Sequence, residues 1–363
     1  MNPAKEYPFL ARVARTMKGP NAKLPQDAQP ENIITALLAG DRRALARAIT
    51  IVENGPAGGG GSAGTGTIGA SDILRETYKL TGRSYILGVT GPPGAGKSTL
   101  VDTFAKLLRA QGKTVGIVAV DPSSPFTGGA ILGDRIRMNS IGTDPGIFIR
   151  SLATRGHLGG LSRAASDVVK VLDASGKDVI IVETVGVGQA EVEIAGLAHT
   201  TIVVVVPGMG DDVQAIKAGI LEIGDVFVVN KADREGADRA VMELDVMLDL
   251  ANRQGWRPPI VKTIANTGEN VAAVVEAVER HRRHITDSGA LERRRMTQGE
   301  NEIRELVGRF AAARILAGAE ESGDFAALAQ RVATRGLDPY SAAEEILAKH
   351  GEAAGGQRND GRE

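Results

Sequence analysis

The chain of 363 residues contains no cysteine, and aromatic side chains make up only 3% of it. Without cysteine there is no disulfide, no thiolate metal ligand and no cysteine nucleophile. The apolar runs span only about six to eight residues, which is too short for a membrane-spanning helix. Residues 1–14 lack the basic start and apolar core of a secretory signal. These absences predict a cytoplasmic protein.

The chain also has no excess of charge of one sign, since it contains 43 Lys and Arg and 44 Asp and Glu. A balanced chain with a pI near 6.6 is not expected to bind nucleic acid or a membrane surface in general. The one basic stretch, 281–295, has no interleaved aromatic residue and is better read as a solvated helical face. Neither nucleic acid nor membrane is therefore expected as a partner.

Glycine is abundant, with 46 residues. Eight of them fall within 55–70, where ordering the backbone costs much entropy, so a flexible linker is expected there. Helical periodicity on both sides places this linker inside an N-terminal helical region, 1–80. A second helical region, 281–363, is expected to end in a disordered polar tail. The central domain then covers 81–280.

The central domain alternates short apolar runs with stretches of helical periodicity. The runs are β-branched and bounded by Gly, Pro or Asp, as buried strands of a parallel sheet are. They cover 85–90, 114–120, 178–184, 201–207, 225–230 and 259–263. The pattern predicts an α/β class: a doubly wound, mostly parallel sheet with helical extensions at both ends.

A phosphate-binding loop follows the first of these runs. The string G-x-x-x-x-G-K-[ST] requires glycines so that backbone N–H groups curl around phosphate, a Lys that reaches the β- and γ-phosphates, and a hydroxyl for Mg²⁺. The alternative is a chance glycine-rich turn, which the flanking strand and helix make a poor explanation. The residues that would contact nucleotide are Gly91, Pro92, Pro93, Gly94, Ala95, Gly96, Lys97, Ser98 and Thr99.

A second motif specifies the base. Asn230, Lys231 and Asp233 form N-K-x-D at the carboxyl end of a predicted strand, where ligands bind in such sheets. An Asp carboxylate accepts hydrogen bonds from guanine N1–H and its 2-amino group, a pair that adenine lacks. Ile264, Ala265 and Asn266 follow the last strand and are placed to supply backbone contacts to the guanine oxygen. GTP and GDP are the expected ligands.

Carboxylates at two other strand ends are candidates for Mg²⁺ and catalysis. Asp121 and Glu183 end predicted strands, and hard oxygen ligands suit Mg²⁺. With Ser98 they form the predicted metal site. Asp134 lies in the loop after Asp121, and Lys97 completes the predicted catalytic set. Ordinary caps and solvated loop charges are the competing interpretation, and it is strongest for Asp134.

Two further segments have the composition of nucleotide switches. Residues 183–186 have the form of D-x-x-G with Glu in place of Asp, and the segment 207–219 opens a helix after a glycine-rich turn. A plain helix start is the alternative for the second segment. The candidate switch residues are Gly186, Gly188, Gln189, Asp211, Asp212 and Lys217.

Taken together these motifs resemble the methylmalonyl-CoA mutase-associated GTPases (MeaB, also called ArgK, with the methylmalonic aciduria type A proteins as relatives). The segments DPSSPFTGGAILGDRIRM and ETVGVGQ carry the resemblance most specifically. It covers roughly 31–350 and departs from the family's pattern at 55–70.

The resemblance implies a SIMIBI-type P-loop GTPase, a homodimer held by its C-terminal helices. It also implies a chaperone that gates adenosylcobalamin loading and protection in a cobalamin-dependent acyl-CoA mutase. Two alternatives remain: a protein kinase acting on periplasmic amino-acid-binding proteins, and a nickel metallochaperone GTPase. The first lacks a recognisable substrate-hydroxyl base, and the second lacks a Cys- or His-rich metal stretch.

Overall fold

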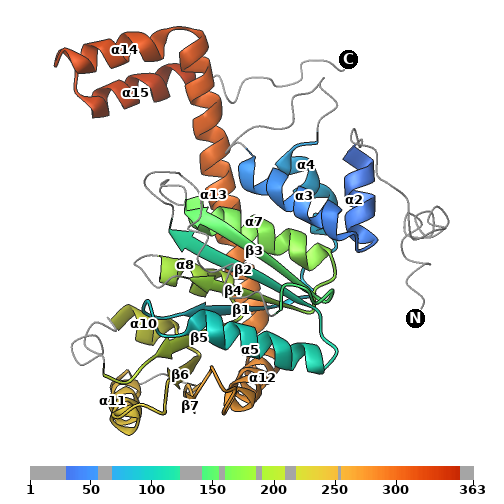
Figure 1. The fold of residues 1–363 in the computed structure, drawn as a ribbon. Helices are drawn as coiled ribbons and strands as arrows, with labels where there is room; N and C mark the ends of the chain where they lie inside the picture. Colours follow the sequence, from blue (N-terminus) through green and yellow to red (C-terminus); the bar gives the residue numbers. More distant parts are fainter. Residues whose placement is uncertain are drawn as a thin grey trace. The chain divides into compact units, whose positions relative to one another are not determined.

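The computed structural model describes residues 30–55, 68–122, 141–154, 160–184, 190–208, 218–251 and 255–351 (Figure 1). Contacts within the chain divide it into two units. The first comprises Met1–Gly55 and Gly59–Glu292, and the second comprises Pro56–Gly58 and Arg293–Glu363.

A seven-stranded sheet forms the centre of the first unit, in the order β3-β2-β4-β1-β5-β6-β7. All its neighbouring strands run parallel. The strands are β1 (Tyr85–Thr90), β2 (Val115–Pro122), β3 (Ile147–Thr154), β4 (Val179–Thr184), β5 (Thr200–Val205), β6 (Val226–Asn230) and β7 (Ile260–Thr263). The doubly wound α/β class is confirmed. Each predicted strand starts within one residue of an observed one.

Helices cover both faces of this sheet, which is why its strands are apolar on both sides. On β4, Val179 and Ile181 join one hydrophobic cluster, whereas Ile180 and Val182 join another. This alternation follows from the two-residue period of a strand. All six residues of β4 are buried, as expected for a parallel strand between two helical layers.

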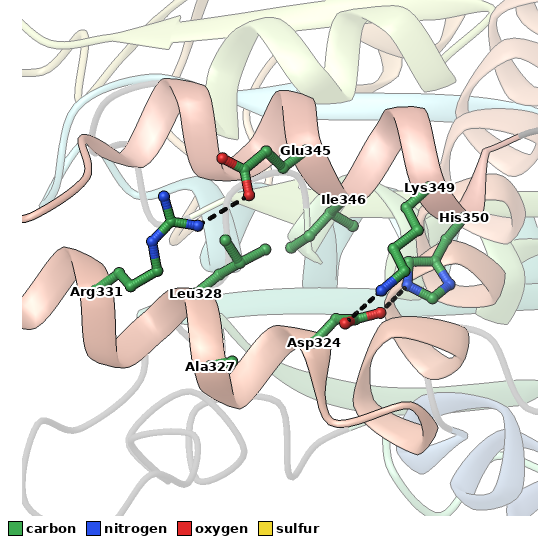
Figure 2. Close-up of a pocket in the computed structure, with 8 residues that line it drawn as sticks. All are labelled: Asp324, Ala327, Leu328, Arg331, Glu345, Ile346, Lys349 and His350. Carbon is green, nitrogen blue, oxygen red and sulfur yellow. Dashed lines mark hydrogen bonds and ion pairs between the residues drawn. The ribbon is translucent and has the colours of Figure 1, made fainter.

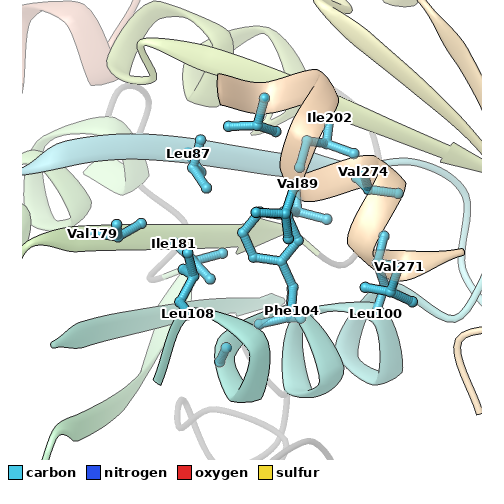
Figure 3. Packing of buried hydrophobic residues seen from close by; sticks show 14 of the residues in the cluster. Leu87, Val89, Leu100, Phe104, Leu108, Val179, Ile181, Ile202, Val271 and Val274 are labelled. Atoms are coloured by element: carbon cyan, nitrogen blue, oxygen red, sulfur yellow. The ribbon is translucent and has the colours of Figure 1, made fainter. Parts of the chain in front are cut away.

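One cluster packs under α5 and α12, and Figure 3 shows Phe104 of α5 and Val274 of α12 against strand residues. The other lies under α2, α3, α4, α7 and α8, and a third joins α11 to β5 and β6. Among the described helices, none is long and apolar enough to cross a membrane. The helices of this unit are α2 (Pro30–Leu38), α3 (Arg42–Asn54), α4 (Ala70–Tyr78), α5 (Lys97–Ala110), α7 (Gly160–Ala174), α8 (Ala190–Leu197), α10 (Ala218–Ile223), α11 (Ala237–Leu250) and α12 (Val271–Asp287).

Strand β3 is an element that the sequence pattern did not predict. It lies at one edge of the sheet and, among the described strands, pairs with β2 alone. Arg150 and Ser151 interrupt its apolar run, so it does not read as a buried strand. The structure accommodates the Arg150 guanidinium through an ion pair with Glu53 of α3. Charged side chains are common on edge strands.

A buried polar cluster lies at the amino ends of the strands and corrects one expectation. His281, the first residue of the basic stretch expected to be solvated, is only 1% exposed. Its Nδ1 lies 2.7 Å from the Thr200 hydroxyl, and its Nε2 lies 3.3 Å from an Asp225 carboxylate oxygen. The Tyr85 hydroxyl lies 2.5 Å from that of Thr200. The cluster ties α12 to β1 and β5.

The second unit contains most of the long helix α13 (Ala290–Glu321), followed by α14 (Asp324–Ala333) and α15 (Pro339–His350). The final helix α15 is capped at its N-terminus, since the Asp338 side chain accepts hydrogen bonds from Tyr340 N and Ser341 N. A small core formed by Ala319, Leu328, Ala342 and Ile346 joins the three helices. A hollow of about 170 Å³ lies between α14 and α15. Figure 2 shows Lys349 and His350 converging on Asp324 there.

Candidate functional site

The predicted phosphate loop runs from the end of β1 to the start of α5, which begins at Lys97. Gly91 has φ 134° and Gly96 has φ 90°. A Cβ at Gly91 would lie 2.0 Å from Val204 O, and one at Gly96 would lie 2.3 Å from Asn230 Nδ2. Both positions therefore require glycine on two grounds, backbone conformation and space.

The Lys97 ammonium lies over the loop that it helps to form. It donates hydrogen bonds to Gly91 O at 2.7 Å and Pro92 O at 2.9 Å, and the residue is 6% exposed. A cation fixed at this place, beside the N-terminus of α5, provides positive charge where anionic phosphates would enter.

Glu183 lies beside the phosphate loop because β4 is the immediate neighbour of β1. In the register of the two strands Glu183 pairs with Val89, two residues before Gly91. The Ser98 hydroxyl donates a hydrogen bond of 2.6 Å to Glu183 Oε1, and Glu183 is 4% exposed. A hydroxyl and a carboxylate facing one another are hard oxygen donors of the kind that Mg²⁺ selects, so the pair fits that ion.

Asn230 connects the base motif to the phosphate loop. Its Nδ2 donates to Ala95 O at 2.8 Å, while its Oδ1 accepts from Ala265 N at 3.0 Å and from Thr263 Oγ1 at 3.2 Å. The neighbouring Lys231 has φ 56° and donates from Nζ to Gly94 O at 2.7 Å. These bonds bring together the ends of β1, β6 and β7, which are far apart in the sequence.

The loop after β7 is closed on itself by backbone hydrogen bonds. Ile264 N donates to Glu269 O, and Thr267 N donates back to Ile264 O. Since Ala265 N is held by Asn230, two of the three predicted guanine-contacting N–H groups are already engaged within the protein. Asn266 N donates to no other group among the described residues. It is the N–H of this trio that remains for a ligand.

The other predicted site residues differ in how far the structure describes them. Asp233 is exposed after the end of β6, and Thr99 lies on α5. The backbone of Asp121 pairs with Ala153 on β3, whereas its side chain lies outside the described part. Also outside the described residues are Asp134, Gly186, Gly188, Gln189, Asp211, Asp212 and Lys217.

Three threonines that were not among the predicted site residues belong to the site. The Thr184 hydroxyl donates to Thr90 Oγ1 at 3.0 Å, joining β4 to β1 at the last residue of each strand. The Thr103 hydroxyl donates to Ala265 O at 3.1 Å, joining α5 to the loop after β7. For the first pair a signal was available, because each residue directly precedes or follows a motif residue; for Thr103 there was none.

Comparison with known proteins agrees with these motifs. The family described as "Methylmalonyl Co-A mutase-associated GTPase MeaB" matches residues 45–320. A relative from Pyrococcus abyssi is 50% identical over 321 residues, covering 87% of this chain and 95% of its own. GTPase ArgK of Escherichia coli is 36% identical over 75% of this chain and 82% of its own.

Two further proteins complete the comparison. The mouse methylmalonic aciduria type A homolog, a mitochondrial protein, is 34% identical over 74% of this chain and 66% of its own. The crystal structure titled LAO/AO transport system kinase superposes with a TM-score of 0.65 at 26% identity, covering 90% of this chain and 99% of its own.

Proposed function

Since the chain belongs to the MeaB family of methylmalonyl-CoA mutase-associated GTPases, we propose that it uses its GTPase cycle to control a cobalamin-dependent acyl-CoA mutase. In that role it gates the loading of adenosylcobalamin and protects the loaded cofactor. Guanine nucleotide binding and GTP hydrolysis are properties of the family. The mutase is the specific partner proposed for this chain.

The nucleotide site supplies the chemistry of this cycle. Lys97 and the backbone N–H groups of the loop bind the β- and γ-phosphates, and Asp233 accepts hydrogen bonds from guanine N1–H and the 2-amino group. Water attacks the γ-phosphorus, the bond to the β-phosphate oxygen breaks, and GDP and inorganic phosphate leave. The observation that carries this assignment is Asn230, whose side chain holds the phosphate loop and the base loop together.

Ser98 and Glu183 are the described residues that would hold Mg²⁺, with Asp121 as a further ligand and Asp134 as a catalytic residue implied by the family resemblance. Bound Mg²⁺ neutralises charge that develops on the phosphate oxygens. Glu183 Oε1 already orients the Ser98 hydroxyl at 2.6 Å. The proposed switch residues around Gly186 and Asp211 would report which nucleotide is bound.

The second unit supports a homodimer. Met296, Ile303, Val307 and Phe310 on α13 are 70%, 63%, 61% and 47% exposed. Their spacing of seven, four and three residues keeps them on one face of the helix. An apolar stripe of this length can pack against a second helix, parallel or antiparallel. A second copy of this chain presents the same stripe.

The test of the proposal is GTP turnover measured with and without an adenosylcobalamin-dependent acyl-CoA mutase. Stimulated hydrolysis and a complex that depends on the bound nucleotide are expected. No stimulation and no complex would contradict the mutase role. Labelled γ-phosphate followed in the same experiment should appear as inorganic phosphate; its transfer to a protein side chain would instead favour a kinase.

A further inference from the structure

Thr103 lies on α5 and belongs to none of the nucleotide-binding motifs. Its hydroxyl donates to Ala265 O at 3.1 Å. Its methyl group also faces this loop, because a Cβ at Gly268 would lie 3.5 Å from Thr103 Cγ2. The helix that begins at the phosphate loop with Lys97 therefore also contacts the loop after β7.

The atom that Thr103 contacts belongs to a peptide unit with a second role. Ala265 C=O and Asn266 N–H are the two polar groups of one planar trans peptide, so they point in opposite directions and turn together. Holding the carbonyl toward α5 fixes the direction of the N–H. Donation to the carbonyl also polarises the peptide and strengthens its N–H as a donor.

The preceding peptide is already immobilised by other contacts. Ala265 N donates to Asn230 Oδ1 at 3.0 Å, and Ile264 O accepts from Thr267 N and Gly268 N. The Ala265–Asn266 peptide can therefore change its orientation only by rotation about the φ and ψ bonds of Ala265. The Thr103 hydroxyl restrains that rotation.

We propose that Thr103 is a positioning residue for guanine recognition, which holds the Ala265–Asn266 peptide so that the Asn266 N–H donates to the base oxygen at position 6. This role rests on the guanine site proposed above. Adenine carries an amino group at that position, which would place a donor against a donor. Thr103 thereby adds to discrimination between guanine and adenine without touching the nucleotide.

The experiment compares Thr103→Val with Thr103→Ser by titration calorimetry of GDP binding. Valine keeps the methyl contact and removes the donor, whereas serine keeps the donor. Loss of one neutral hydrogen bond weakens binding by about fivefold, so this is the expected change for Thr103→Val. Thr103→Ser is expected to stay within about twofold of the original affinity, by the same reasoning.

Two nucleotide analogues separate positioning from a general structural effect. In 6-thio-GDP a weakly accepting sulfur replaces the base oxygen, and in IDP the 2-amino group is absent. The affinity ratio of GDP to 6-thio-GDP is expected to shrink in Thr103→Val, while the ratio of GDP to IDP stays unchanged. An unchanged GDP affinity, or an equal loss for GDP and 6-thio-GDP, would overturn the role of Thr103.

Asp233→Asn keeps failure of this role distinct from failure of the guanine site. If that variant loses the preference for GDP over IDP, the proposed guanine site is supported, and the Thr103 variants then test the role of Thr103 alone. If Asp233→Asn retains the preference, the proposed guanine site is wrong and the role of Thr103 falls with it.

Discussion

The Ser98 hydroxyl donates a hydrogen bond of 2.6 Å to Glu183 Oε1, so the first turn of α5 is tied to the end of β4. The two residues lie 85 positions apart in the sequence. They meet because β4 inserts next to β1 in the sheet. Both are oxygen donors at the phosphate loop, which makes their pairing the most direct structural support for the proposed Mg²⁺ site.

Glu183→Gln should slow GTP hydrolysis while sparing nucleotide binding. The substitution removes a negative charge next to the proposed ion, and we expect a fall in turnover of at least about tenfold. Turnover measured over a range of Mg²⁺ concentrations should need more Mg²⁺ to reach half of its maximum, and GDP binding in the presence of a chelator should be preserved. Glu276→Gln, an exposed carboxylate on α12, is the matched control. Unchanged turnover and metal dependence would contradict the assignment.

Asn230→Ala should destabilise the fold as well as the site. The side chain is 2% exposed, and its removal leaves Ala95 O and Ala265 N without their partner. Each buried group left unpaired costs roughly 1–3 kcal/mol, so a loss of about 3 kcal/mol in the free energy of unfolding is expected. Denaturant unfolding measures it. GDP should also stabilise the variant less.

Asn54→Ala serves as the control for that measurement, since Asn54 bonds Thr50 O at an exposed position. A change below about 0.5 kcal/mol is expected there. If Asn230→Ala were no more destabilising than this control, the bridging role of Asn230 would be refuted.

Asp324 makes the second unit sensitive to acid. Hydrogen bonds from Lys349, Ser322 and His350 hold the pKa of the Asp324 carboxyl well below its usual range. A group whose folded pKa is lowered contributes stability above its unfolded pKa, near 3.9, and loses it as pH falls through the folded value. Asp324→Asn should therefore lower the melting temperature at pH 7. The difference in melting temperature between the variant and the original chain should become smaller below about pH 4.

Calorimetry of the full chain between neutral and strongly acidic pH checks this. Glu321→Gln is a suitable control, because that exposed carboxylate closes α13 just before the turn into α14. A difference between Asp324→Asn and the original chain that stays constant with pH would refute the linkage.

Val307→Glu should separate the proposed dimer into monomers. The substitution buries a charge in the expected helix–helix contact, which is costly without a partner. Ile303→Glu should behave in the same way. Sedimentation at several protein concentrations measures the mass, and Arg304→Glu, also exposed on α13, is the control. Unaltered association in both glutamate variants would place the interface elsewhere.

Most of the fold could be predicted because it is encoded locally. Apolar β-branched runs, such as the one that forms β4, identify a buried strand without reference to the rest of the chain. Strand β3 was not predicted because Arg150 breaks its apolar run. Glu53, which forms the ion pair that accommodates Arg150, lies in a distant part of the sequence.

The site shows the same division. The phosphate loop and N-K-x-D are contiguous strings with a known mechanical role, and the sequence alone identified them. The hydrogen bond from Asn230 to Ala95 spans 135 positions, and that from Thr103 to Ala265 spans 162. No local pattern contains such pairs of residues. Contacts between distant residues also decide which N–H of the 264–266 trio stays available for a ligand.

The sheet order has a consequence for synthesis of the chain. The phosphate loop leaves the ribosome with β1, yet β1 is flanked by β4 and β5. The contact of Thr90 with Thr184 needs 94 further residues, and the contact of Ala95 with Asn230 needs 135. Distant pairing of this kind forms slowly. A nascent chain is thus expected to acquire nucleotide affinity in one late step, when β6, β7 and the loop after them have emerged, so that bound GDP marks completion of the domain.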